Sequence, residues 1–355
     1  MVPRKEAVRK RLTAKRPCAY EYPRSGDVMR IWLFAVGMVV TGCAAVGMPE
    51  PAPENPIPDR GWSLVWADEF DGDLLDRSKW APEVSCWGGG NKEHQCYVDR
   101  PETISVADGY LTLTARAGEA SGPSLNMDHA DYPGPSKTQP YTSGKLRTRD
   151  LAHWTYGRIE GRMKLPTGQG AWPAFWMMPQ FDVHGGWPLS GEIDIMEAVN
   201  LGAICEDCED SQVENRTSGA IHFGKRPPLN EHISKRRALT SVPNQIGAPR
   251  DQFHTYAVEW AEGRIDWFVD GERFWTATTS DWFTEAVDKE LNPNAPFDED
   301  FYLMLNFAVG GNWPEGANAG GIDPAAFPDD MVVDYVRVYQ CAPDLATGRA
   351  CLLDE

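Results

Sequence analysis

The sequence has little of what builds a helical or a nucleic-acid-binding protein. Segments with a helical hydrophobic period are few and no internal repeat is present, which argues against helical bundles and solenoids. Basic residues are scarce, because 34 Lys and Arg stand against 52 Asp and Glu, a net charge of −18. So acidic a chain is a poor partner for nucleic acid or an anionic polysaccharide. A neutral polymer fits better.

One apolar stretch near the N-terminus is too short and wrongly flanked for a membrane-spanning helix. Residues 29–46 read MRIWLFAVGMVVTGCAAV, the pattern of a secretory signal. The segment Val40-Thr41-Gly42-Cys43 resembles the bacterial lipoprotein box, which predicts acylation of Cys43; the alternative is an ordinary signal peptide that contains a Cys. Ala44 after the Cys favours the outer membrane, by analogy with lipoprotein sorting. We therefore predict an exported, outer-membrane-anchored lipoprotein on the periplasmic or cell-surface face.

The chain has no second linker, so we expect a single folded domain. Met29 stands where such a signal normally begins, and the residues before it are basic without an apolar pattern. Removing residues 1–42, which hold nine basic and three acidic residues, makes the net charge −24. The predicted parts are an over-long, disordered gene start (1–28), a lipoprotein signal peptide (29–43), a Pro-rich tether (44–61), the domain (62–341) and a C-terminal tail (342–355).

Cysteine usage agrees with export. Of eight Cys, Cys18 lies in the suspect leader and Cys43 is the lipid candidate. The other six form three close pairs: Cys86/Cys96, Cys205/Cys208 and Cys341/Cys351. An even count in an oxidising compartment suggests disulfides, and local pairing is the simplest of about fifteen connectivities. The Cys205–Cys208 CxxC lacks a second CxxC or a nearby His, so a loop staple is favoured over a redox or zinc site.

The secondary-structure pattern is β. Residues 264–279 hold two β-rich runs about Asp270-Gly271, a strong hairpin signal. Ser280–Leu291 is either a short helix or a loop. Further strands are expected at Tyr110–Ala115, Gly157–Leu165, Phe175–Met178, Gly191–Ala198, Thr217–Phe223, His254–Trp260, Phe301–Phe307 and Met331–Tyr339. Many short strands separated by turn residues predict an all-β sandwich or jelly roll.

One strand carries three acids in an otherwise apolar run, Gly191-Glu-Ile-Asp-Ile-Met-Glu-Ala198. Alternation puts Glu192 and Asp194 on one face but Glu197 on the other. A β-bulge at Ile195-Met196 would return Glu197 to the acidic face. The two Glu Cα atoms are then about 13 Å apart, and leaning side chains bring the carboxyl groups to about 5–6 Å, the separation of a retaining glycosidase.

Three close carboxylates cannot all ionise easily, so one is pushed towards its protonated form. A protonated Glu can protonate a leaving group. A calcium site or a solvent-facing acidic strand is the alternative. The Trp-rich segments Trp172-Pro-Ala-Phe-Trp176 and Trp187-Pro188 nearby favour catalysis. The spacing does not say which Glu has which role.

These residues resemble glycoside hydrolase family 16, in its bacterial laminarinase-like (endo-1,3-β-glucanase) branch. The resemblance runs from about Trp62 to Gln340. It includes Trp66-Ala-Asp-Glu-Phe70, Gly90-Asn-Lys-Glu93, Tyr156-Gly-Arg-Ile-Glu-Gly-Arg162, Gly219-Ala-Ile-His222, Phe253-His-Thr-Tyr256, Asn306-Phe-Ala-Val-Gly-Gly-Asn-Trp313 and Asp334-Tyr-Val-Arg-Val-Tyr339, besides the acidic strand. It implies a concanavalin-like β-jelly roll with an open concave cleft, and retaining endo-hydrolysis through a covalent glycosyl-enzyme without a catalytic cofactor.

The resemblance also implies residue roles. Glu192 would be the nucleophile, Glu197 the general acid/base, and Asp194 a partner that orients the nucleophile. Met196 would be the extra residue of the bulge. The substrate-binding candidates are Asn91, Trp172, Trp176, Trp187, His222 and Trp313. A structural calcium site on the far, convex face would use Glu69, Gly109 and Asp334 and do no chemistry.

One departure from the family pattern concerns substrate preference. Many laminarinases have Gly-x-Trp-Pro-x-Asn after the His222 strand, whereas this chain has Lys225-Arg-Pro-Pro-Leu-Asn230. One stacking platform is therefore missing. The first hypothesis is a monomeric enzyme that cleaves β-1,3 bonds of a neutral β-glucan. The alternatives are a mixed-linkage β-glucanase or a red-algal galactan hydrolase of the same family, with sulfated galactans disfavoured by the acidic surface, and a non-catalytic glycan-binding module.

Overall fold

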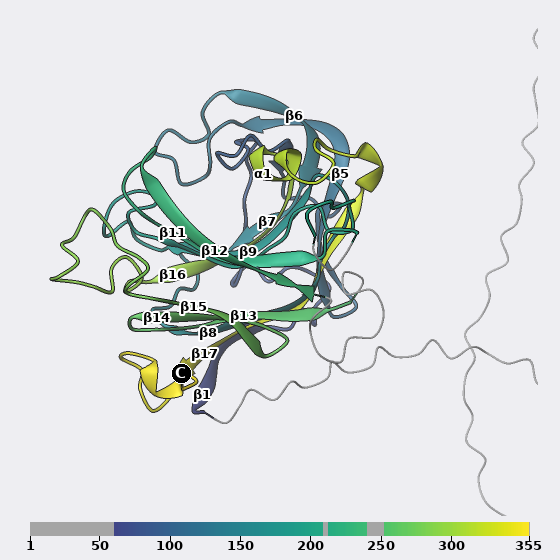
Figure 1. Ribbon diagram of the computed structural model, residues 1–355. Coiled ribbons are helices and arrows are strands. Elements are labelled where there is room, and N and C mark those ends of the chain that lie inside the picture. Colours follow the sequence, from purple (N-terminus) through teal and green to yellow (C-terminus); the bar gives the residue numbers. More distant parts are fainter. Residues whose placement is uncertain (1–59, 209–211, 240–251, 355) are drawn as a thin grey trace, which may run out of the picture. The chain divides into compact units, whose positions relative to one another are not determined.

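The computed structural model describes residues 60–208, 212–239 and 252–354. Within these ranges the chain forms a two-layer β-sandwich (Figure 1). The all-β jelly-roll prediction is therefore confirmed. The predicted signal peptide, Cys43 and most of the tether lie outside the described residues.

The larger layer has ten strands in the described part of the chain. Its order is β15-β14-β13-β8-β17-β5-β6-β3, with β1 paired to β17 and β4 to β5. Its strands are β1 (Trp62–Asp68), β3 (Gln95–Tyr97), β4 (Ile104–Ala107), β5 (Tyr110–Pro123), β6 (Ser136–Ser143), β8 (Gly157–Lys164), β13 (His254–Ala261), β14 (Arg264–Val269), β15 (Glu272–Thr278) and β17 (Asp329–Cys341).

The second layer carries the acidic strand near its middle. Seven described strands follow the order β12-β11-β10-β9-β16-β7-β2. They are β2 (Ala81–Pro82), β7 (Lys145–Arg147), β9 (Ala171–Pro179), β10 (Glu192–Glu197), β11 (Arg216–Gly224), β12 (Asn230–Ala238) and β16 (Phe301–Val309). Helical turns are short: α1 (Asn312–Gly316), η3 (Pro324–Ala326) and η4 (Arg349–Cys351). None of the helices described is long and apolar enough to cross a membrane.

The core lies between the two sheets and fixes which face of β10 is free. Ile193, Ile195 and Met196 are buried in it. Trp267 of β14, in the opposite sheet, donates a hydrogen bond from Nε1 to the backbone oxygen of Asp194 at 2.8 Å. Each fully buried aliphatic side chain contributes about 1.5–3 kcal/mol. Turning β10 over would lose that burial and would bury its acids.

The expected strands are all present. The Asp270-Gly271 hairpin is a two-residue turn in which both residues have positive φ, 48° and 80°, as a type I′ turn requires. Ser280–Leu291 is a loop of turns rather than a helix. The β12 strand was not predicted, because as an edge strand it has no regular apolar alternation.

All three local disulfides are formed. Cys86 pairs with Cys96, Cys205 with Cys208, and Cys341 with Cys351. The last pair holds the segment after β17 against the domain, where Ala342 N donates to Gly61 O at 2.9 Å. The predicted local connectivity is confirmed.

Candidate active site

The three acids share the outer face of β10 because the strand contains the predicted bulge. Against β9, Asp194 pairs with Trp176 and Met196 with Phe175, so Ile195 is the extra residue. The bulge is therefore where it was expected, but the assignment of Met196 as its extra residue is wrong, because Met196 keeps its partner on β9. The register against β11 shifts in the same interval, between Asp194 and Glu197. Both Ile195 and Met196 enter the core, and Glu197 returns to the acidic face.

Glu192 lies at one end of this acidic row. Trp187, from the loop after β9, donates a hydrogen bond from Nε1 to Glu192 Oε2 at 2.6 Å. His222 of β11 is directly opposite Glu192 in the register, and its Nε2 is 3.7 Å from Glu192 Oε1. Trp187 is 39% exposed, so an indole face is available to a ligand.

Glu197 lies at the other end and has a different environment. Trp172 of β9 donates a hydrogen bond from Nε1 to Glu197 Oε1 at 3.0 Å. The Trp172 ring meets that of Trp313, from α1, edge to face with centroids 5.5 Å apart. This Trp pair forms a wall beside the Glu197 carboxyl.

Burial and mutual repulsion make both Glu carboxyl groups weaker acids than an ordinary Glu. Burial, followed by the charge of Asp194, raises the pKa of Glu192 to about 7. The same two causes raise the pKa of Glu197 well above its ordinary value. The hydrogen bond from each Trp opposes the rise by stabilising the carboxylate.

Asp194 and His222 occupy the middle of the row. Asp194 is 2% exposed, and its Oδ2 lies 3.4 Å from His222 Nε2. Burial lowers the pKa of His222, but the carboxylates of Glu192, Asp194 and Glu197 outweigh it and raise the pKa to about 10. His222 Nδ1 is buried without a hydrogen-bond partner in the described structure, and Asp194 Oδ2 has only its contact with His222 Nε2. Such orphaned atoms point to a ligand or water that completes the network.

Trp176 and Asn91 extend the candidate surface beyond the acids. Trp176 lies next to Asp194 across the sheet, and its Nε1 donates to Asn306 Oδ1 at 2.7 Å. Lys145 Nζ sits 5.1 Å from the centre of the Trp176 ring. Asn91 O accepts a hydrogen bond from Asn312 N at 2.8 Å, which places Asn91 beside the turn that carries Trp313.

Three residues of this face were not predicted. His232 of β12 stacks on His222 with centroids 5.3 Å apart. Asn306 holds Trp176, and Arg236 of β12 lies over the Trp313 ring, 5.9 Å from its centre. Asn306 lies within the motif Asn306–Trp313 and on the same face of its sheet as Trp176. The motif could therefore have identified it as a residue of the site. No sequence signal pointed to β12.

The predicted calcium residues do not converge through their side chains. Glu69 is paired with Arg337 by two hydrogen bonds of 2.8 Å, and Asp334 is paired with Arg162. Gly109 lies in the turn between β4 and β5. In the described part of the chain, no group of three potential metal-ligating side chains includes Glu69 or Asp334. With both carboxylates neutralised by arginines, the side chains as found do not fit a cation.

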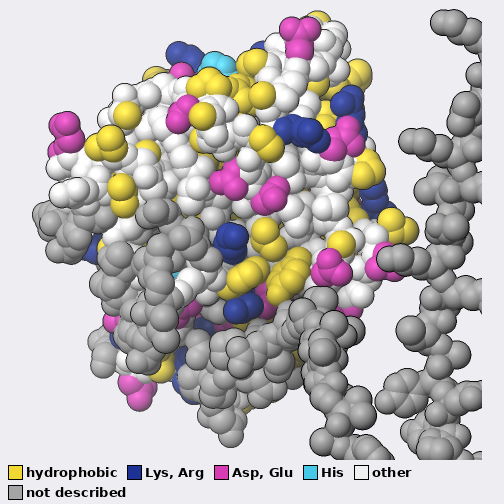
Figure 2. Space-filling view, turned by 90° about the vertical axis from the view of Figure 1, so that its right-hand side faces the viewer, with side chains coloured by type: hydrophobic (Ala, Val, Ile, Leu, Met, Phe, Trp, Pro, Cys, Tyr) yellow, Lys and Arg dark blue, Asp and Glu magenta, His cyan; other side chains and the backbone are white. Residues whose placement is uncertain are grey.

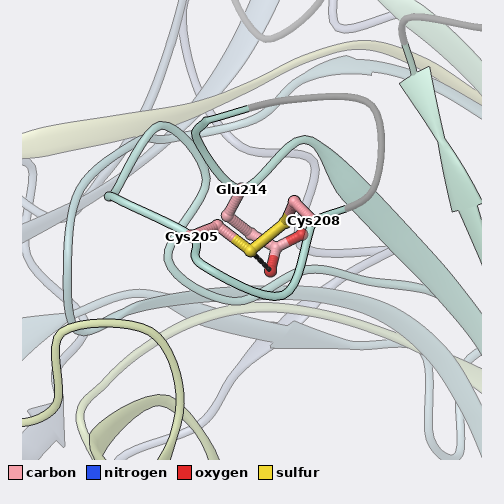
Figure 3. A group of neighbouring side chains, drawn as sticks. All are labelled: Cys205, Cys208 and Glu214. Carbon is pink, nitrogen blue, oxygen red and sulfur yellow. Dashed lines mark hydrogen bonds between the residues drawn. A yellow bond between two sulfur atoms is a disulfide. The ribbon is translucent and has the colours of Figure 1, made fainter.

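The Cys205–Cys208 disulfide supports the loops at the Glu197 end. Glu214 lies beside it, with Oε2 3.8 Å from Cys205 Sγ (Figure 3). Glu214 also accepts hydrogen bonds from Arg216 at 2.6 and 2.7 Å, and from Asn318 at 3.3 Å in the loop after α1. Because both sulfurs are in the disulfide, this group is not a thiolate metal site.

This fold and site define a class of protein. An all-β sandwich that presents two carboxyl groups and a third acid on one strand, flanked by indole side chains, has the parts of a glycoside hydrolase that uses a carboxyl pair. Burial and Asp194 raise the pKa of both Glu groups, and a carboxyl group with a raised pKa can serve as the general acid of such chemistry.

Comparisons with known proteins agree. A family model described as β-porphyranase A–D, GH16 domain, matches residues 62–341. The glucan endo-1,3-β-glucosidase A1 of Niallia circulans is 40% identical over 288 residues, which is 79% of this chain and 38% of that protein. A β-glucanase of Rhodothermus marinus is 35% identical over 91% of this chain and 99% of that protein. The laminarinase structure from Rhodothermus marinus superimposes with a TM-score of 0.61 at 36% identity, covering 78% of this chain and 97% of that one.

The chain belongs to glycoside hydrolase family 16. It is a glycosidase, and the family resemblance read from the sequence is confirmed. The chain spans 38% of the length of the Niallia circulans relative, so any activity of that whole protein is transferred only as a proposal.

Proposed function

We propose that this protein is an endo-acting, retaining hydrolase of β-1,3-glucosidic bonds in laminarin-like β-glucans. The observation that carries the proposal is the pair Glu192 and Glu197 on one face of β10, each hydrogen-bonded by a different Trp. The names of the Niallia circulans and Rhodothermus marinus relatives support β-1,3-glucan as the substrate class. The aromatic surface suits a neutral sugar, because indole faces stack on pyranose rings.

The two carboxyl groups act in sequence. Glu197, whose pKa burial and Asp194 raise well above its ordinary value, donates its proton to the glycosidic oxygen as the bond from that oxygen to the anomeric carbon breaks. Glu192 attacks the anomeric carbon and forms a glycosyl ester. Water then attacks the same carbon, gives its proton to Glu197 and releases Glu192 as a carboxylate. Two inversions give retention.

Asp194 and His222 have opposite effects on the ionisation of the two Glu residues. Asp194 lies between the two Glu residues, and its charge favours the protonated form of Glu197. His222, with its raised pKa, is a cation at neutral pH and lowers the pKa of Glu192, which keeps part of the nucleophile ionised. Trp187 fixes one oxygen of Glu192 and leaves the other for attack.

Product analysis tests the substrate assignment. Laminarin, lichenan, agarose and porphyran would be incubated with the full chain, and products separated by size and observed by NMR at early times. We expect oligosaccharides from laminarin, with the β-anomer formed first. No oligosaccharide from laminarin would sink the assignment, and an α-anomer formed first would contradict retention.

A galactan hydrolase is the second candidate. The observation that favours it is the family model, whose description names β-porphyranases. Products from porphyran or agarose without products from laminarin would establish it. A mixed-linkage glucanase would act on lichenan in preference to laminarin.

Location and association are separate proposals. We infer that the protein is exported, lipidated at Cys43 and anchored in the outer membrane as a monomer, on the strength of the signal and lipoprotein-box pattern. Fractionation of cells that express the chain or Cys43→Ser tests this, since the variant should leave the membrane fraction. Light scattering of the domain tests the monomer.

A structural calcium ion stays a prediction of the resemblance. It would need Asp334 to exchange Arg162 for the ion, with backbone oxygens at Glu69 and Gly109 as further ligands. Calorimetry with and without a chelator tests it. A fall in Tm that added calcium restores would support the ion.

A further inference from the structure

A small recess of about 10 Å³, with room for about one water molecule, lies beside Glu197 on the side away from Glu192, and we call it the pocket. Residues from β10, β11, β12, α1 and the loop before β11 line it, among them Glu197, Glu214, Arg216, Ser218, Arg236 and Trp313. Glu197 pairs with Ser218 and Ser218 pairs with Arg236, so the three lie in one row across the sheet. Arg236 therefore faces the same side as the catalytic acids.

The two arginines of this pocket differ in their partners. Arg216 is hydrogen-bonded to the buried Glu214 at 2.6 and 2.7 Å. Burial raises the pKa of Glu214, but the hydrogen bonds from Arg216 outweigh it and leave that pKa below its ordinary value. Glu214 is thus a carboxylate that neutralises Arg216.

Among the residues that the structure describes, Arg236 has no such counter-ion. It is exposed, and in the described part of the chain its recorded contact is the face of the Trp313 ring. Glu197 does not supply the missing charge, because its Oε1 accepts the hydrogen bond from Trp172 and, among the described residues, no ion pair joins Glu197 to Arg236. The pocket therefore carries one uncompensated positive charge in a chain whose net charge is −18.

Local charge and net charge need not agree. Figure 2 shows Lys and Arg side chains among acidic ones on one face of the molecule. The β12 strand itself is rich in basic residues, with Lys235, Arg236 and Arg237 in succession. The negative net charge of the chain therefore does not exclude an anionic ligand from this pocket.

We propose that Arg236 and Trp313 form a subsite for a sugar ring that carries an anionic substituent, a sulfate ester or a carboxylate. Trp313 stacks on the ring, and the planar guanidinium of Arg236 donates a paired hydrogen bond to the substituent. The inference rests on the proposed function, because the pocket adjoins Glu197 in the role of acid/base. It makes the enzyme one that accepts a partly substituted chain next to its cleavage site.

The test compares neutral laminarin with two derivatives of matched substitution, one sulfated and one oxidised at C6 to carboxylates. The variants are Arg236→Gln, Arg236→Lys and the control Lys235→Gln. Lys235 is the neighbouring basic residue and lies on the other face of β12. It pairs with Gly219 of β11, and a side chain at Gly219 would point towards Trp267 in the core and away from the catalytic acids. We expect Arg236→Gln to lower the charged-to-neutral ratio of kcat/KM about tenfold. Arg236→Lys should keep part of it, and Lys235→Gln should keep all of it.

Salt gives a second readout. High NaCl should bring the wild-type ratio down to that of Arg236→Gln, because screening weakens the ion pair. A response with only one derivative would identify that substituent as the ligand. An equal loss on neutral and charged laminarin would overturn the subsite and leave Arg236 as a support for Trp313. No effect on either substrate would also overturn it.

The subsite can be separated from the proposed reaction. Calorimetric titration of Glu192→Gln with charged and neutral oligosaccharides measures binding without cleavage. Glu192→Gln should bind the charged ligand more tightly than the neutral one, and the double variant Glu192→Gln/Arg236→Gln should not. This result would support the subsite even if laminarin is not hydrolysed. Equal binding of both ligands by Glu192→Gln refutes it even if laminarin is cleaved.

Discussion

The two ends of β10 carry the same residue in two different settings. At one end Glu192 accepts a hydrogen bond from the exposed Trp187 and faces the cationic His222. At the other end Glu197 accepts a hydrogen bond from Trp172 and borders the Trp313 wall. Both pKa values are raised by burial and by Asp194, that of Glu192 to about 7 and that of Glu197 well above its ordinary value.

The position of His222 provides what the spacing of the acids could not. Two Glu residues on one strand are equivalent in sequence, and the resemblance alone assigned their roles. The nearby His222 cation favours ionisation of the Glu192 end more than of the Glu197 end, because it lies directly across from Glu192. The group that ionises more readily is suited to attack, and the one that keeps its proton is suited to donate it.

The largest expected effect comes from removing each carboxyl group. Glu192→Ala and Glu197→Ala should each lower kcat on laminarin by about 10³-fold or more. With an aryl β-glucoside whose leaving group needs no proton, azide should rescue both variants with opposite stereochemistry. Glu192→Ala should give the α-azide by direct attack, and Glu197→Ala the β-azide through the glycosyl-enzyme.

The two azide products separate the ends of the strand. Steady-state kinetics and NMR of the anomeric proton give the measurement, with Lys235→Gln as a control for expression and folding. If the stereochemistry is exchanged between the variants, the roles of Glu192 and Glu197 are exchanged as well.

The sequence could predict those features of the site that depend on a single short segment. The bulge at Ile195-Met196 was predictable, because apolar and acidic residues in one short segment can satisfy both faces only with an extra residue. The Asp270-Gly271 hairpin and the three disulfides were predictable for the same local reason.

The contacts that distinguish the two Glu residues were not predictable, because they join distant segments. The Trp187 and Trp172 indoles reach the acids from a loop and from a neighbouring strand, so their hydrogen bonds depend on sheet order. The β12 strand is mostly polar at an edge of its sheet, and its His232 and Arg236 enter the site only through pairing with β11. A sequence pattern for burial cannot detect such a strand.

The next prediction concerns the pKa of each Glu, changed separately by removing the hydrogen bond that its Trp donates. Activity needs Glu192 ionised and Glu197 protonated, so kcat/KM should rise with pH near 7 and fall at a higher pH where Glu197 loses its proton. Each indole N–H stabilises a carboxylate, so its removal raises that pKa. Trp187→Phe should move the rising limb up by about half a pH unit, and Trp172→Phe the falling limb.

The pH dependence of kcat/KM across both limbs measures this, and each variant is the other's control. Loss of sugar stacking would lower the whole curve without moving a limb. A shift of both limbs by either substitution would show that the two carboxyl groups titrate as one unit.

The smallest expected effect is on thermal stability. It compares how much the burial of Glu192 and of Glu197 destabilises the folded protein when each group is ionised. A Glu whose pKa is raised above its ordinary 4.5 in the folded protein binds its proton more tightly there than in the unfolded chain. Its contribution to the free energy of unfolding is therefore complete below pH 4.5 and is lost as the pH rises towards the pKa of the folded state. Gln does not titrate, so Glu197→Gln should match the wild-type Tm at pH 4 and exceed it by about 2–5 °C at pH 8. Glu192→Gln should gain less, because ionised Glu192 still pairs with His222 in the wild type and the variant loses that partner. Calorimetry at both pH values gives the comparison. Equal gains at pH 4 and pH 8 would mean that packing, and not the buried charge, separates the two ends of β10.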